Sequence, residues 1–314
     1  MSHAPAAGVN RVDVEAPAKV NLFLRVLGRR DDGYHELQTL VAPIGLADTV
    51  SIRAGRDADA RELSLSLSLE GEPALTQSVP ADGSNLVLRA ARELAEAAGV
   101  HGFAEVRLHK RVPAAAGLGG GSSDAAASLR ALNELWGCGL ATDELSAIGA
   151  RVGSDVPALL ADGPALASGR GEHVEAVPLP GFSCAVVMFD FAVSTADAFG
   201  WWDDDGGETG PDPQPSLATL TAGEGGGAWL EALRSGARND LEAPVMKRHP
   251  VIRRVRDRLL ERGAGAAIMC GSGPSVAAFF AEGGRLDESV AAELAGMSGR
   301  PVVTAGSWTP KAGA

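Results

Sequence analysis

The first third of the chain alternates apolar and polar residues, which is the period-two pattern of β-strands. Over 12–24 this alternation divides a predicted strand into two faces, with Val20, Leu22 and Leu24 on one and Lys19, Asn21 and Phe23 on the other. A Gly-rich turn over 28–33 ends this strand. Further strands are expected over Leu46–Ile52, Leu63–Leu69 and Ala104–Lys110.

Apolar residues at spacings of three to four mark the helices, and N-cap residue types mark their starts. Leu86, Ala90 and Leu94 share one face of a helix predicted over 85–98. A second helix is predicted over Ala125–Leu135, after the N-cap residue types Ser122–Asp124. Later helices are expected from Thr142, over Val251–Glu261 and over Leu286–Met297.

The pattern changes near Pro178, after which strands and helices are mixed more evenly. Residues 203–227 are acidic, rich in Gly and Pro and without periodicity, so we predict a mobile surface insertion there. A chain of 314 residues exceeds the usual size of one domain. We therefore expect two α+β domains, over residues 1–177 and 178–314.

Charge and composition exclude several classes of partner. The net charge is −12, whereas a nucleic acid or an anionic membrane surface would need a basic face. Residues 1–11 lack the apolar core of a signal peptide, and no apolar run is long enough to span a membrane. The three cysteines show neither zinc spacing nor a disulfide framework. These features predict a cytoplasmic protein with reduced thiols.

The strongest chemical signal is the segment Pro113–Ala127, which reads PAAAGLGGGSSDAAA. Glycines let backbone N–H groups approach a ligand closely, and the start of a helix favours anions, so the segment predicts a phosphate cradle. A flexible connection is the plain alternative. The loop lacks the Gly-Lys-Ser/Thr of a Walker loop, and Ser122 stands where the dinucleotide fingerprint needs Gly. A third type of phosphate loop is therefore implied.

Lysine usage points to two further candidates. Only four lysines accompany 24 arginines, which singles out Lys19 and Lys110 as compact ammonium groups with a specific task. Lys19 shares its predicted strand face with Asn21. The structural alternative for this face is a solvated strand edge.

Three other polar residues are candidates for binding or catalysis. The pair Tyr34-His35 suits stacking on a flat heterocycle and hydrogen bonding to its edge, or else ordinary packing in a hairpin. Asp155 lies in the turn Gly153–Pro157, where it is either aimed inward or forms an Asx-turn.

Taken together, these segments resemble the GHMP kinase superfamily, which includes galactokinase, homoserine kinase and mevalonate kinase. The loop Pro113–Ser123 is similar to the superfamily's glycine-rich signature, and Gly271–Ser275 is similar to its C-terminal glycine motif. Three further motifs resemble the branch that phosphorylates a cytidine diphosphate-linked methylerythritol, namely Ala16–Leu24, Asp32–Leu40 and Gly153–Pro157. The resemblance runs in consistent order from Ala16 to Phe280.

The resemblance implies a two-domain α+β fold, with a ribosomal-protein-S5-like α/β domain followed by a ferredoxin-like α+β domain. It implies ATP-dependent transfer of a phosphoryl group to the 2-hydroxyl of the cytidylyl substrate, a step of the non-mevalonate isoprenoid precursor pathway, with Mg2+ accompanying ATP. The alternatives are a superfamily kinase for homoserine or a mevalonate-type alcohol, and a catalytically silent nucleotide-binding relative. A homodimer is left open.

The resemblance also implies roles for single residues. Asp155 is expected to accept the proton of the substrate hydroxyl, and Lys19 to keep that carboxylate ionised and stabilise the developing charge. The cytidylyl substrate would contact Asn21, Tyr34, His35, Thr195, Phe199, Gly271, Ser272 and Gly273. ATP would contact Ser84, Asn85, Lys110, Pro113, Ala114, Ala115, Ala116, Gly117, Leu118, Gly119, Gly120, Gly121, Ser122 and Ser123. The Ser123 hydroxyl is the candidate Mg2+ ligand, and Asp124 is expected to cap the following helix.

Overall fold

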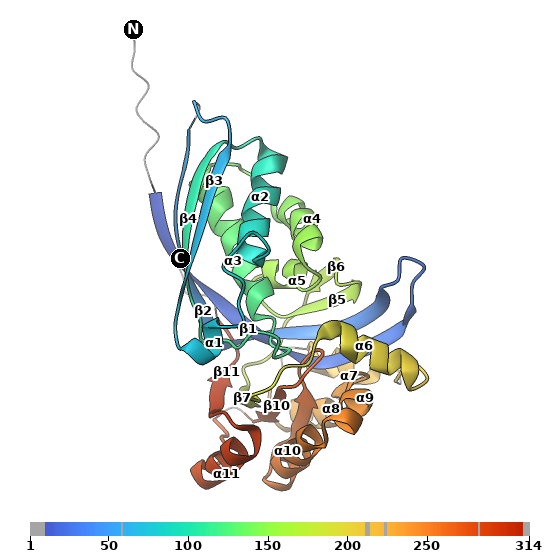
Figure 1. Ribbon diagram of the computed structural model, residues 1–314. Helices are drawn as coiled ribbons and strands as arrows, with labels where there is room; N and C mark the ends of the chain where they lie inside the picture. The colour runs from blue at the N-terminus through green and yellow to red at the C-terminus, as the bar shows by residue number, and fades with distance from the viewer. Residues whose placement is uncertain (1–9, 58, 211–213, 223–224, 282, 310–314) are drawn as a thin grey trace.

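The structure, a computed structural model, describes residues 10–57, 59–210, 214–222, 225–281 and 283–309. Two β-sheets lie against each other, and helices cover their outer faces (Figure 1). Residues 1–9 lie outside the described residues, and the same holds for 211–213 and 223–224 of the predicted insertion. Residues 1–9 belong to the N-terminal segment 1–11, whose composition is unlike that of a signal peptide.

The larger sheet is built around one long antiparallel hairpin, β1 (Asn10–Arg29) and β2 (His35–Arg56). Its main path continues outward from β2 to β4 (Gly102–His109) and β3 (Leu63–Glu70), and from β1 to β8 (Arg238–Asn239). A second hairpin, β5 (Ala165–Gly169) and β6 (His173–Ala176), extends the sheet from β2. The strands predicted in the first half are confirmed, whereas β5 and β6 were missed because only their connecting turn gave a signal.

Irregular pairing in β1 changes the two faces that the sequence pattern predicts. The register shifts between Pro17 and Lys19 and again between Asn21 and Phe23. Phe23 is therefore buried in the same core as Val20, on the face opposite to the one predicted.

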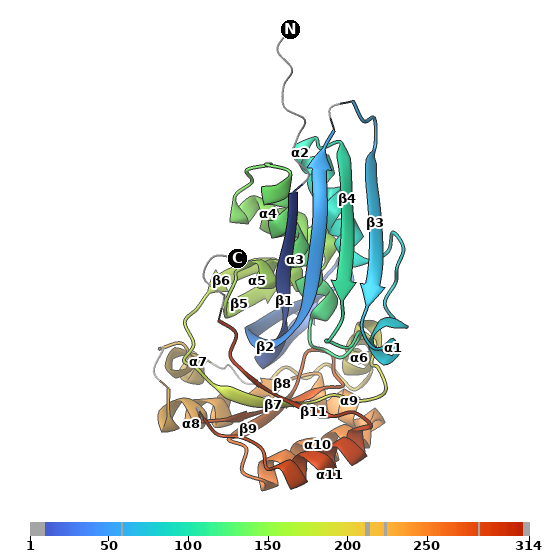
Figure 2. The same cartoon turned by 90° about the vertical axis from the view of Figure 1, so that its left-hand side faces the viewer.

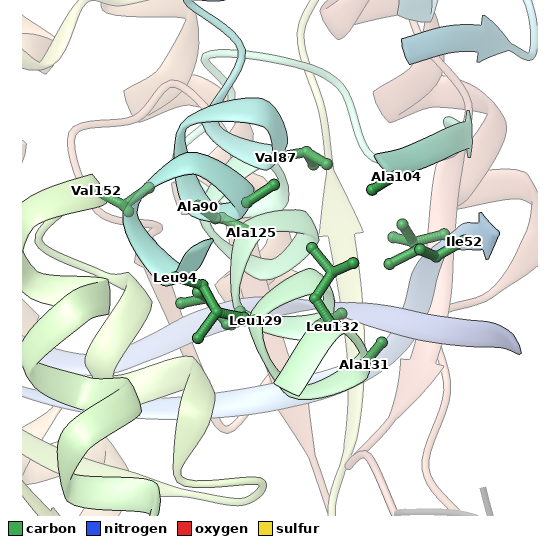
Figure 3. Packing of buried hydrophobic residues seen from close by; sticks show 14 of the residues in the cluster. Ile52, Val87, Ala90, Leu94, Ala104, Ala125, Leu129, Ala131, Leu132 and Val152 are labelled. Carbon is green, nitrogen blue, oxygen red and sulfur yellow. The ribbon is translucent and has the colours of Figure 1, made fainter. Parts of the chain in front are cut away.

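Four helices cover one face of the larger sheet: α2 (Leu86–Ala98), α3 (Gly120–Leu135), α4 (Thr142–Val152) and α5 (Val156–Leu160). Their apolar faces pack on the sheet (Figure 2). Leu132 of α3 lies on the side of Ile52, whereas Leu129 lies beside Leu94 of α2, and Ala90 and Ala125 lie at the contact between α2 and α3 (Figure 3). The helices predicted over 85–98 and from Thr142 are confirmed, and Asn85 caps α2 by accepting the Val87 N–H.

Helix α3 begins five residues earlier than the sequence pattern predicts. Its N-cap is Gly119, with φ +67°, and no side chain caps it. Asp124 lies inside the helix, so its expected capping role is wrong; its carboxylate is instead held by a buried ion pair with Lys110. Glycine is a poor helix former, which is why the pattern gave no sign of helix at Gly120 and Gly121.

The smaller sheet is antiparallel, in the order β11 (Val302–Gly306), β7 (Ser183–Val187), β10 (Val276–Phe280) and β9 (Ala266–Met269). Its outer face is covered by α10 (Pro250–Glu261) and α11 (Glu288–Ser298). Its inner face packs against the β1–β2 hairpin through Cys184, Val186, Ala277 and Phe279. The hairpin therefore lies between two cores.

The described part of segment 203–227 is largely helical and partly buried, so the expectation of a solvated loop there is wrong, whereas its mobility stays a prediction. Asp203 belongs to α6 (Thr195–Asp204), and α7 (Gln214–Leu220) follows it. Leu217 and Leu220 are buried in the same core as Trp229 of α8 (Gly227–Gly236). Helices this short, separated by glycines, leave too few apolar positions for a period to be recognised. The remaining helices are α1 (Pro73–Thr76) and α9 (Glu242–Arg248).

Strand pairing largely follows the two predicted domains. All paired strands before residue 177 lie in the larger sheet, and those after 178 lie in the smaller one except β8, which pairs with β1. The division at 177/178 stays a prediction. None of the described helices combines the length and apolarity needed to cross a lipid bilayer.

Candidate active site

A cavity of about 840 Å3 lies where the two halves of the chain meet. The β1–β2 hairpin contributes Lys19 and His35 to its lining, and α6 contributes Phe199. The glycine loop supplies one wall, and Gly271 and Ser272 supply another. A concave site of this size, lined by apolar residues and a few polar groups, is typical of a small-molecule site.

The glycine loop is clamped on both sides by backbone hydrogen bonds. The Lys19 N–H donates to the Leu118 carbonyl at 2.9 Å, and the Ser275 N–H donates to the Ala116 carbonyl at 3.3 Å. At Gly117, where φ is +76°, an added Cβ would clash with the carbonyl of Cys270, the residue directly before the second glycine motif. Only glycine fits at this close approach.

Helix α3 starts inside the cavity wall, directly after this loop. Gly120, Gly121 and Ser122 form its first turn and line the cavity. The first N–H groups of a helix have no partner within it, and the helix dipole favours negative charge there. This end of the cavity is therefore suited to phosphate groups.

Lys19 and Asp155 meet in the lining of the cavity. The Lys19 side chain is only 3% exposed, and its Nζ lies 3.5 Å from Asp155 Oδ2. The Asp155 side chain is 44% exposed and stands directly before α5. A buried ammonium beside an accessible carboxylate can stabilise negative charge that develops on a reacting oxygen.

Asn21 holds Lys19 in place and has little left to offer a ligand. Its Oδ1 accepts from Lys19 Nζ at 2.9 Å and from the Gly271 N–H at 2.8 Å, while its Nδ2 donates to Thr39 Oγ1 at 2.8 Å. The Thr39 hydroxyl in turn donates to the Phe23 carbonyl. The network links the hairpin to the second glycine motif, so Asn21 acts on the site through Lys19 and Gly271.

A second buried network lies beneath the glycine loop. Lys110 Nζ donates to Asp48 and, at 2.8 Å, to Asp124 Oδ2. Asp48 also accepts the Arg111 and Val112 N–H groups, at the start of the loop. Two carboxylates share one ammonium, and Asp124 Oδ1 has no hydrogen-bond partner.

Burial and the neighbouring charges shift the pKa values of Asp124 and Lys110. Burial raises the pKa of the Asp124 carboxyl to about 7, and the neighbouring Asp48 adds to the rise although Lys110 opposes it. Burial lowers the pKa of Lys110, but its two carboxylate partners outweigh burial and raise that pKa overall. Lys110 therefore stays a cation that fixes the loop to α3.

Aromatic rings form another part of the cavity lining. The rings of His35 and Phe199 stack with centroids 4.7 Å apart, and Trp202 meets His35 edge-on at 5.6 Å. The Arg170 guanidinium covers the Tyr34 ring at 3.6 Å from its centroid. Tyr34 is 52% exposed, so a flat ligand can reach the ring.

Comparison with known proteins decides the family. Residues 85–164 match the profile described as GHMP kinases N terminal domain, and residues 222–295 match GHMP kinases C terminal. The 4-diphosphocytidyl-2-C-methyl-D-erythritol kinase of Moorella thermoacetica is 40% identical to this chain, over 85% of this chain and 90% of its own length. The enzyme of that name from a Nocardioides species is also 40% identical, over 96% and 98%.

The chain belongs to the GHMP kinases, in the family of the 4-diphosphocytidyl-2-C-methyl-D-erythritol kinases. A crystal structure of 4-(cytidine 5'-diphospho)-2C-methyl-D-erythritol kinase superposes with a TM-score of 0.70 at 32% identity, covering 95% of this chain and all of that one. A homoserine kinase from Cytophaga hutchinsonii superposes with a TM-score of 0.67 at 18% identity, covering 95% of each chain, and so shares the fold. The predicted α+β GHMP kinase fold is confirmed.

Most of the residues predicted for the site of this GHMP kinase line the 840 Å3 cavity. The exceptions are Leu118, Ser123 and Gly273, which lie behind the lining. Ser123 is 2% exposed, whereas Ser122 is partly exposed and lines the cavity, so the serine predicted to bind Mg2+ is not the one in the cavity lining.

Two predicted nucleotide contacts have their polar side-chain atoms engaged elsewhere. Lys110 is occupied by Asp48 and Asp124, as described above. The Asn85 amide donates to the Pro80 carbonyl and accepts the Val87 N–H. Both residues line the cavity, but Lys110 holds the loop through Asp48 and Asn85 caps α2, so neither presents a free charged or amide group.

Sequence reasoning missed three residues that shape the site: Asp48, Arg170 and Asp203. For Asp203 a signal was present, because Thr195, Phe199 and Asp203 are spaced four residues apart and so share one helix face. Asp48 and Arg170 gave no local signal.

The buried cysteines and the metal-binding residue types give no second candidate for catalysis in the described part of the chain. Burial raises the pKa of the Cys184 and Cys270 thiols to about 12, so neither is a ready nucleophile. The described part of the chain contains no group of three or more His, Cys, Asp or Glu side chains placed to hold a metal ion.

Proposed function

We propose that this chain is an ATP-dependent kinase that phosphorylates the 2-hydroxyl of 4-diphosphocytidyl-2-C-methyl-D-erythritol. The observation that carries the proposal is that one cavity is lined by a helix start for phosphates, by the Lys19–Asp155 pair and by an aromatic group around His35. Relatives named for this activity are about 40% identical over most of the chain.

At the phosphate end, the glycine loop and the first turn of α3 hold the ATP phosphates through backbone N–H groups. Mg2+ prefers oxygen ligands and keeps several waters, so it can be bound by the phosphates with few protein ligands. The Ser122 hydroxyl is the oxygen donor of the loop that faces the cavity, and it replaces Ser123 as the proposed ligand. When bound, Mg2+ neutralises part of the charge on the phosphates.

At the Lys19–Asp155 pair, Asp155 accepts the proton of the attacking hydroxyl. Lys19 stabilises the negative charge that forms on the alkoxide and on the transferred phosphoryl group. Phosphoryl transfer depends mainly on positioning and electrostatics, and the Asn21 network fixes the ammonium for this purpose.

At the aromatic end, Tyr34, His35 and Phe199 bind the cytosine base. Aromatic faces stack on a base, and the polar edge of His35 supplies a hydrogen bond to it. The hydrogen bond between Thr195 Oγ1 and Ser272 Oγ, 3.2 Å long, joins α6 to the second glycine motif across the cavity, where it would flank the diphosphate.

An ADP-release assay tests the proposal. Purified protein, ATP and Mg2+ are combined with the cytidylyl substrate, homoserine, mevalonate or no acceptor. We expect ADP release above the no-acceptor rate only with the cytidylyl substrate. Release with homoserine or mevalonate would assign another superfamily activity, and release with none of them would favour a silent nucleotide-binding relative.

Two expectations from the sequence stay predictions. A cytoplasmic location is consistent with the net charge of −12 and the reduced cysteines, and fractionation of the source cells would test it. A homodimer is testable by sedimentation of the purified chain.

A further inference from the structure

The ring of His35 is fixed by a carboxylate from the other half of the chain. Asp203 Oδ1 lies 3.0 Å from His35 Nε2, and Asp203 Oδ2 lies 3.7 Å from an Arg29 nitrogen. Phe199, one helical turn before Asp203, covers a face of the same ring. His35 is thus held by a polar contact at one nitrogen and by stacking on its face.

The hydrogen-bond chemistry of this contact determines where the imidazole proton sits. An ionised carboxylate has no proton to donate, so it only accepts, and His35 Nε2 must carry the hydrogen. In a neutral imidazole the other nitrogen, Nδ1, is then an acceptor. Nδ1 has no hydrogen-bond partner within the described part of the chain, and His35 lines the cavity, so this acceptor is left for a ligand.

We infer that Asp203 is a specificity-determining positioning residue, which makes His35 Nδ1 an acceptor and so favours cytosine over uracil. Cytosine presents an amino group at position 4, a donor that matches an acceptor at Nδ1. Uracil presents a carbonyl oxygen at that position, which would face the Nδ1 lone pair and leave both groups unsatisfied. The inference rests on the proposed function, because it concerns the base of that substrate.

The position of the proton is measured directly on the free protein. Nitrogen NMR of the histidine side chains at about pH 8, where an ordinary imidazole is neutral, distinguishes the two tautomers. We expect His35 to carry its hydrogen on Nε2 in the wild type. In Asp203→Ala we expect a mixture of tautomers. A wild-type His35 with its hydrogen on Nδ1 would overturn the inference.

Binding of cytidine diphosphate and uridine diphosphate, measured by calorimetry, tests the consequence. We expect the wild type to prefer cytidine diphosphate and the ratio of the two dissociation constants to fall about tenfold in Asp203→Ala, the effect of one hydrogen bond. Asp203→Asn, whose amide can either donate or accept, should give an intermediate ratio. Asp204→Asn is the matched control, since Asp204 is the next residue of α6 and is exposed, and its ratio should equal that of the wild type.

The outcomes separate this inference from the proposed function. Cytidine diphosphate binding with an unchanged ratio in Asp203→Ala and Asp203→Asn would overturn the inference and leave the proposed substrate standing. Failure of the wild type to bind cytidine diphosphate, while ATP still binds, would contradict the proposed substrate and the inference together. Nucleotide binding by the control variant shows that a charge change in α6 is tolerated.

Discussion

Asp155 is the residue on which turnover should depend most. In Asp155→Asn the side chain keeps its size but no longer takes the proton of the substrate hydroxyl. We expect turnover to fall by about a thousandfold, the usual contribution of a general base, with ATP affinity within about twofold of the wild type. Steady-state kinetics and ATP titration measure the two quantities.

The matched control for this change is Asp143→Asn, which alters an exposed carboxylate in the first turn of α4. It should leave turnover unchanged. If Asp155→Asn kept most of the wild-type turnover, Asp155 would not be the base.

Tyr34 should affect the cytidylyl substrate and not ATP. Its exposed ring is supported by Arg170 on one face, which leaves the other face for the base. Stacking of a base on an aromatic ring contributes roughly 1 to 3 kcal/mol, so Tyr34→Ala should raise the KM for the cytidylyl substrate by about tenfold or more. Tyr34→Phe retains the ring and should behave like the wild type. Equal changes in both KM values would remove Tyr34 from base binding.

The sequence could nominate single residues but could not show how they are connected. Lys19, Asn21 and Asp155 were candidates from residue type and position, and the structure brings Lys19 within reach of both. The role expected for Asn21, contact with the substrate, could not be checked from the sequence because its partners Thr39 and Gly271 are far along the chain. Likewise Asp203 and His35 are 168 residues apart, so no local pattern joins them.

At the scale of elements, the glycine loop requires glycine at some positions and not at others. Gly117 combines positive φ with close approach to Cys270, so Gly117→Ala should lower the free energy of unfolding by at least about 2 kcal/mol and weaken ATP binding. Gly121 has ordinary helical geometry, and an added Cβ there would lie 3.5 Å from Leu86.

Gly121→Ala is therefore the control within the same loop. Alanine is the better helix former, so the unfolding free energy should stay the same or rise by up to about 1 kcal/mol. Urea unfolding measures both variants. If both variants lost the same free energy of unfolding, the close backbone contact at Gly117 would not explain the need for glycine there.

The Asp48–Lys110–Asp124 network should make stability depend on pH. The pKa of Asp124 is raised to about 7 in the folded state, above its ordinary value near 4, so the folded state binds more protons between these limits. Stability from this group is therefore present at acid pH and lost as pH rises through about 7. From pH 5 to pH 8 the loss is on the order of 2 kcal/mol.

Asp124→Asn removes this titration while its amide oxygen can still accept from Lys110. We compare the free energy of urea unfolding of the variant with that of the wild type at several pH values. The difference should change in favour of the variant as the pH rises from 5 to 8. Parallel pH profiles for the two proteins would contradict the assignment of the titrating group to Asp124.

For the whole molecule, local pattern predicted most strands and helices, because burial on one face imposes a period on each of them. It failed where elements are short or glycine-rich, as at α7 and at the start of α3. It also failed where a bulge changes the alternation, as at Phe23. The packing of the smaller sheet on the β1–β2 hairpin, which forms the cavity, depends on contacts between distant segments and left no local mark on the sequence.

The central claim is that one cavity brings ATP phosphates and a cytidylyl alcohol together across Lys19 and Asp155. Phosphorus NMR of the reaction with the cytidylyl substrate tests it most directly. We predict a new phosphomonoester signal equal in amount to the ADP formed, with the diphosphate of the substrate intact. ADP formed together with free phosphate, and no new phosphomonoester, would contradict the account.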